Sequence, residues 1–137
     1  MAQNLVVTDS DCATQHMRAF ADACAREWGR QVWRLWMQDQ GWPARSLLGR
    51  IIDEGLNGAG HTGGKQWYPE AFDDKGQLVS RALRRMPESD RNAIAIHYAV
   101  PVPVKRKLVV LKIPESTYFR SLRAARDRLA NLLGGQS

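Results

Sequence analysis

The sequence has few cysteines and no long apolar run. Cys12 and Cys24 are the only cysteines among its 137 residues, and no pair of cysteines or histidines has metal-ligand spacing. We therefore expect two free thiols in a reducing cytoplasm and no metal site. No apolar run approaches the ~18 residues of a membrane span, and the start "MAQNLVVTDSDC" lacks the features of a signal peptide. We expect a protein that is neither embedded in a membrane nor secreted.

The sequence also lacks a complete catalytic or cofactor-binding motif. Its three histidines, His16, His61 and His97, fall on separate segments. The stretch "GHTGGK" does not complete the phosphate-binding loop motif, because Ala59 stands where that motif needs its first glycine and Gln66 where it needs Ser or Thr. We therefore predict that the protein is not an enzyme, has no catalytic residues and needs no cofactor.

What the sequence does have is an uneven distribution of charge. Its net charge is +6, and its hydrophobic content of 44% is ordinary for a globular protein. Residues 1–74 carry 7 basic and 10 acidic side chains, a net charge of −3, whereas residues 75–137 carry 13 and 4, a net charge of +9. This asymmetry favours a polyanionic partner for the second part, although a merely solvated basic surface would have the same composition.

The apolar residues recur at helical spacing along most of the chain. We expect a long helix that begins at Asp9, Ser10 or Asp11 and ends near Met37, and a second helix over residues 44–55. A glycine-rich loop follows, and the pattern is helical again from residue 73, with prolines separating the helices. The sequence thus predicts an all-α helical bundle in three parts: an N-terminal helical region over residues 1–55, the glycine-rich loop over 56–72 and a C-terminal module over 73–137.

The C-terminal module predicts a helix-turn-helix. A helix ends at Met86, another starts at Pro87, a short one covers about Val104 to Leu111, and the turn "LKIPES" leads into a final helix. That final helix has a buried stripe at helical spacing, which consists of Tyr118, Leu122, Ala125, Leu129 and Leu132. Ser116, Arg120 and Arg123 lie roughly 140° to 200° around the helix from Tyr118, so they face away from the core. Arginine and serine in that position can contact DNA bases or phosphates.

The segments "RALRRMPESDRNAIAIHY" and "LKIPESTYFRSLRAARDRLANLL" resemble region four of bacterial sigma factors, over about residues 77–133. The chain is also similar to the phage antitermination Q proteins of the phage 21 type. These combine such a module, with a motif like "TYFR" at the start of its last helix, with a tryptophan-rich N-terminal part, here "REWGRQVWRLW" and the later "WYP".

The resemblance implies a phage transcription antiterminator of the host bacterial cytoplasm. Such a protein binds double-stranded DNA at a late promoter, joins the sigma-bearing RNA polymerase of the host and allows readthrough of terminators in late genes. The residues that would read DNA are Ser116, Thr117, Arg120 and Arg123, and those that would contact phosphate are Lys105, Arg106 and Lys112. The N-terminal helices would engage polymerase or a second copy of the chain on DNA.

Four residues depart from the sigma pattern. Lys112 replaces the usual turn glycine, Pro114 the usual serine cap, Lys107 an apolar residue, and Leu108 a small alanine that lets the helices cross closely. These departures leave open whether the helix before the turn is regular. Two other functions also stay open: a promoter-bound transcription regulator or sigma-like factor, and a small nucleic-acid-processing enzyme, against which the missing metal cluster counts.

Overall fold

All regular secondary structure in the described part of the chain is helical. The computed structural model describes residues 2–39, 47–53, 55 and 72–134. The helices with defined bounds are α1 (Ala2–Asp39), α3 (Asp74–Arg84), α4 (Glu88–Ala99), α5 (Val104–Leu111) and α6 (Glu115–Leu133), and residues 47–53 are helical as well. No strand occurs within these ranges, which confirms the all-α class. The predicted glycine-rich loop lies outside the described residues, apart from Phe72.

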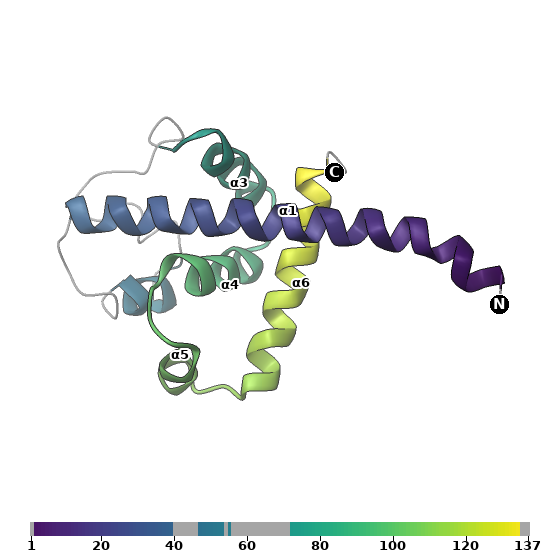
Figure 1. Ribbon diagram of the computed structural model, residues 1–137. Coiled ribbons are helices and arrows are strands. Elements are labelled where there is room, and N and C mark those ends of the chain that lie inside the picture. The colour runs from purple at the N-terminus through teal and green to yellow at the C-terminus, as the bar shows by residue number, and fades with distance from the viewer. Residues whose placement is uncertain (1, 40–46, 54, 56–71, 135–137) are drawn as a thin grey trace.

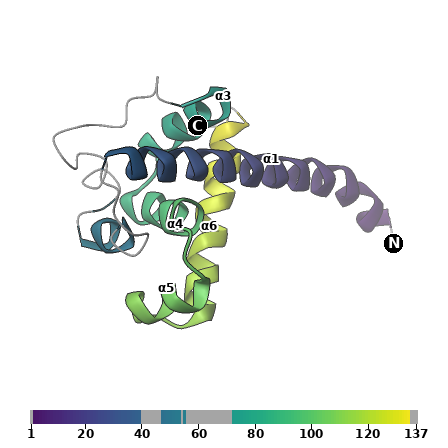
Figure 2. The ribbon, with the colours of Figure 1, turned by 60° about the vertical axis from the view of Figure 1, so that its left-hand side comes forward.

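The central helix of the bundle is α1. α3, α4 and α6 all pack against it, and α3 and α4 also contact α6. Figures 1 and 2 show α3 and α4 on opposite sides of α1, with α6 crossing it. The N-terminal end of α1 extends beyond the other helices, and α5 lies beside the start of α6, at the end of the molecule opposite α3.

One face of α1 supplies the centre of the core. Its buried side chains recur at steps of three and four, as an amphipathic helix requires: Ala21, Cys24, Ala25, Trp28, Val32 and Trp36. Trp33 packs against the same core from a half-buried position. Tryptophans at helical spacing therefore serve packing, and each buried ring stabilises the fold by roughly 1.5–3 kcal/mol or more. Phe20, whose position in the sequence has the same helical spacing, is 41% exposed.

The start of α1 differs from the sequence prediction. The helix begins at Ala2, whereas the sequence predicted a cap at Asp9, Ser10 or Asp11. The physical reason is that no glycine or proline occurs before Gly29, so nothing interrupts the helix once it has formed. A residue that can cap a helix does not have to mark its first turn when the residues before it can also form a helix.

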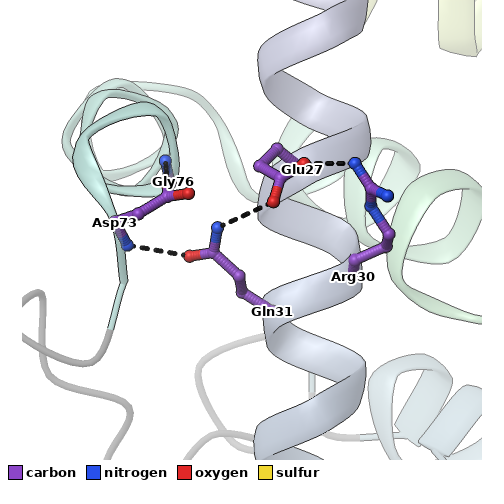
Figure 3. Close-up of polar contacts among 5 residues, drawn as sticks. All are labelled: Glu27, Arg30, Gln31, Asp73 and Gly76. Atoms are coloured by element: carbon purple, nitrogen blue, oxygen red, sulfur yellow. Dashed lines mark hydrogen bonds and ion pairs between the residues drawn. The ribbon is translucent and has the colours of Figure 1, made fainter.

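Side chains of α1 fix the position at which α3 begins. Asp73 precedes α3 and its carboxylate accepts a hydrogen bond of 2.9 Å from the Gly76 backbone N–H, which satisfies one of the free donors of the first turn. Gln31 Oε1 accepts a hydrogen bond of 3.0 Å from the Asp73 backbone N–H, and Gln31 in turn donates to Glu27 (Figure 3). A Cβ at Gly76 would lie 2.5 Å from Gln31 Oε1, so this contact requires glycine.

Helices from both ends of the chain share one core. α1 and the C-terminal α3, α4 and α6 bury their apolar side chains in a single cluster. The division into residues 1–55, 56–72 and 73–137 stays a prediction about function. A fragment that lacked α1 would expose the core faces of three helices, so functional tests on this protein need the whole chain.

Candidate nucleic-acid interface

α5 and α6 are two helices joined by a short turn, and we refer to the pair as the α5–α6 unit. α5 is a regular helix over Val104–Leu111, which answers the question that its unusual sequence left open. Lys112 ends it in the left-handed conformation, with φ 59° and ψ 42°, and its N–H donates to Leu108 O at 2.8 Å. Pro114 then precedes the first residue of α6. A left-handed turn residue costs about 1 kcal/mol when it is not glycine, and here it places a lysine in the turn.

Lys107 holds α5 against the end of α4. Its side chain is only 2% exposed, and its Nζ donates a hydrogen bond of 3.2 Å to His97 O in the last turn of α4. A cation at the carbonyl end of a helix is favoured by the helix dipole. Burial nevertheless lowers the pKa of Lys107 to about 8, because the charged form loses water contacts. Lys107, which replaces an apolar residue of the sigma pattern, is therefore buried like the residue it replaces, and its ammonium group donates a hydrogen bond to a backbone carbonyl.

The buried face of α6 matches the predicted stripe. Tyr118, Leu122, Ala125 and Leu129 are buried, and Leu132 is half-buried against the core. The Tyr118 hydroxyl lies 2.9 Å from His97 Nδ1. Burial lowers the pKa of His97 to about 4, with smaller contributions from Lys107 and Arg126, so the ring is neutral at pH 7. Its Nδ1 can therefore accept a hydrogen bond from the Tyr118 hydroxyl. This bond fixes the first turn of α6 to α4.

The predicted DNA-contacting residues lie on the opposite face of this unit. Six of the seven are exposed, and Thr117 is half-buried. All come from α5, the turn or the first half of α6, which together form one end of the molecule in Figures 1 and 2. We call this set the basic surface, and its members are Lys105, Arg106, Lys112, Ser116, Thr117, Arg120 and Arg123. Its outward placement agrees with the helical-wheel prediction, whereas its role in binding stays a prediction.

The arginines of α6 divide into two groups with different surroundings. Arg126 lies 3.7 Å from Asp22 of α1, and Arg128 lies 3.0 Å from Asp90 of α4. Arg120 and Arg123, by contrast, have no acidic partner among the residues that the structure describes. The first half of α6 thus keeps its charge available to a ligand, while the second half uses its charge to contact the bundle. The sequence alone does not separate these groups, because the pairing depends on helices far apart in the chain.

Asp22 is a polar junction that sequence reasoning missed. Its carboxylate accepts a hydrogen bond of 2.6 Å from the Tyr98 hydroxyl and one of 2.7 Å from Arg26 Nε, and it also faces Arg126. Partial burial acts to raise the pKa of Asp22, but the bonds from Tyr98 and Arg26 outweigh it and hold the pKa below its usual value. Asp22 therefore stays ionised at pH 7 and links α1, α4 and α6. No local sequence signal marks this residue, since its partners lie 76 or more residues away except for Arg26.

The described residues contain neither a cluster that could bind a metal ion nor a helix that could span a membrane. Among them, no three His, Cys, Asp or Glu side chains gather where they could hold a metal ion. None of the helices in the described ranges is both long and apolar enough to cross a bilayer. Comparisons with protein-family models, with curated proteins and with solved structures each found no match to this chain.

Proposed function

We propose that this protein is a phage transcription antiterminator that binds duplex DNA at a late promoter through the basic surface and then joins sigma-bearing RNA polymerase. One observation carries the DNA-binding part. Five cationic side chains are exposed on the α5–α6 unit, and the arginines of its second helix divide into paired ones that face the bundle and unpaired ones that face outward. Unpaired cations concentrated on one surface favour a polyanion.

The roles of the individual residues follow from their chemistry. The major groove is about 12 Å wide and admits one α-helix, so α6 would enter it by its N-terminal half. Arg120 and Arg123 would donate to guanine edges, which arginine contacts in a bidentate manner. Ser116 and Thr117 lie in the first turn of α6, where their hydroxyls would read base edges beside the two arginines. Lys105, Arg106 and Lys112 would contact phosphates on either side.

The polymerase step is supported by the resemblance of residues 77–133 to sigma region four and of the tryptophan-rich segments to the phage Q proteins. The structure offers a compatible arrangement, since α1 extends beyond the bundle on the side away from α5 (Figure 1). A second copy of the chain on DNA is part of the same proposal. The alternative, a promoter-bound regulator that never travels with polymerase, needs only the basic surface.

Transcription in vitro separates these functions. The template carries a phage late promoter and a downstream terminator, and the enzyme is sigma-bearing bacterial RNA polymerase. The whole chain should increase terminator readthrough, and the double variant Arg120→Glu/Arg123→Glu should not. DNA binding without any change in readthrough would leave the promoter-bound regulator as the function. Readthrough that survives the double variant would show that the basic surface does not recruit the protein to DNA.

A further inference from the structure

A groove between α1 and α4 has a chemistry unlike that of the basic surface. It lies between the C-terminal half of α1 and the end of α4 and has a volume of about 420 Å³, which is large enough for one or two side chains of a ligand. Its floor and walls are mainly apolar, from Trp33, Met37, Tyr98 and Pro101. Arg30 and Arg34 line the same groove.

The floor of the groove is held rigidly. α1 and α4 approach so closely here that a Cβ at Gly29 would lie 2.0 Å from Tyr98 O. The Tyr98 ring is fixed at its hydroxyl by the 2.6 Å bond to Asp22 and lies edge-on against His97, with ring centroids 4.9 Å apart. A ligand that enters the groove therefore meets a preformed surface and loses little free energy to reorganisation of the protein.

The charges of the groove define the ligand further. Arg34 is exposed and has no acidic partner among the described residues, whereas Arg30 is paired with Glu27 on its own helix. Met37, an apolar side chain next to these cations, is 43% exposed. An exposed methionine on a rigid apolar floor beside an unpaired cation suits a ligand that carries both a large apolar group and a carboxylate.

We propose that this groove docks a short acidic peptide segment of a protein partner, which places a large apolar side chain on Trp33, Met37 and Tyr98 and a carboxylate beside Arg34. A peptide fits better than a nucleic acid. Single-stranded nucleic acids bind along continuous basic tracks with exposed aromatic faces. Here Arg30 is already paired, and the two aromatic lining residues, Trp33 and Tyr98, are both half-buried. The proposal does not depend on DNA binding by the basic surface.

Isotope-labelled whole protein titrated with synthetic peptides tests this inference. The probes are twelve-residue amphipathic peptides with leucines on one face and glutamates beside them, and matched peptides in which glutamines replace the glutamates. The glutamate series should shift the resonances of Gly29, the Trp33 indole and Tyr98 at lower peptide concentrations than the glutamine series. Arg34→Glu should weaken binding by about three- to tenfold, because it replaces an attraction by a repulsion at a partly exposed site. Arg81→Glu, a charge reversal at an exposed site on α3, is the matched control and should leave the affinity unchanged.

Four results would overturn the proposal. The first is the absence of groove shifts with any glutamate peptide at millimolar concentration. The second is equal binding of the glutamate and glutamine series, or equal affinity of the Arg34→Glu variant. The third is a stronger groove response to an oligouridine than to the peptides, which would make the groove a nucleic-acid site. The fourth is groove shifts that grow with protein concentration alone, which would make a second copy the occupant.

The DNA affinity of Arg34→Glu, measured in parallel, should equal that of the unmodified chain. This result would show that the groove and the basic surface act separately.

Discussion

Replacement of Lys107 by methionine should stabilise the protein at neutral pH and change how stability depends on pH. Lys107 is 2% exposed, and burial lowers its pKa from the ordinary 10.5 to about 8. A difference of this size means that folding disfavours the charged form by about 3 kcal/mol, at ~1.4 kcal/mol for each pH unit. Methionine has a similar length and carries no charge. Because it gives up the bond to His97 O, we expect a net gain of about 1–3 kcal/mol at pH 7.

The sign of the pH dependence follows from proton linkage. Because the folded-state pKa lies below the unfolded one, the unfolded chain binds more protons above pH 8, and stability rises with pH until the unfolded lysine also titrates. Between pH 7.5 and 9.5 this group should add about 2 kcal/mol to the free energy of unfolding. In Lys107→Met that increment is absent, so the gain from the substitution should shrink as the pH rises.

Urea unfolding followed by tryptophan fluorescence measures both effects. Unfolding curves of the unmodified chain and of Lys107→Met, recorded at several pH values from 7.5 to 9.5, give the difference in free energy at each pH. Other ionisable groups are common to both proteins, so their contributions cancel in the difference. A difference that stays constant with pH would refute the buried position of the Lys107 ammonium. A loss of stability at pH 7.5 would show that its bond to His97 O outweighs desolvation.

Two further substitution pairs test the interface and the helix packing. Arg120→Ala and Arg123→Ala should each weaken binding to the specific DNA site by about 1–3 kcal/mol in gel-shift titrations, and equal losses on random duplexes would reduce both residues to phosphate contacts. Gly29→Ala should destabilise the protein by about 1–3 kcal/mol in thermal unfolding, because its Cβ would overlap Tyr98 O, whereas Gly49→Ala, with nothing within 4 Å, should be neutral or stabilise by up to about 1 kcal/mol. Equal effects at the two glycines would contradict the close approach of α1 and α4.

The helices of the C-terminal module could be predicted from sequence because local signals define their ends. Pro87, Pro103 and Pro114 immediately precede α4, α5 and α6, since a residue before proline avoids helical dihedrals and proline itself suits a helix start. The buried stripe of α6 and its outward arginines follow from a period of 3.6 residues. In the same way, the helical spacing of Trp28 and Trp36 in α1 indicates packing, and both are buried in the core.

The contacts between distant helices could not be predicted, because nothing local encodes them. The pairing of Arg126 with Asp22 and the insertion of Lys107 under α4 depend on how three helices meet in space. The predicted start of α1 was wrong because Asp9, Ser10 and Asp11 can cap a helix but do not start this one, which already begins at Ala2. The groove between α1 and α4 could not be predicted either. The close approach of Gly29 to Tyr98 O joins two residues that are far apart in the sequence.

The most direct test of the central claim is the salt dependence of binding to a 30-base-pair duplex between 50 and 200 mM salt. If Lys105, Arg106 and Lys112 each neutralise one phosphate, the slope of log affinity against log salt should be about −3. Lys105→Gln/Arg106→Gln should make the slope shallower by about 2, and the control Arg81→Gln/Arg84→Gln on α3 should leave it unchanged. An affinity that ignores salt, or a slope that changes with the α3 pair instead, would contradict the assignment of DNA binding to this surface.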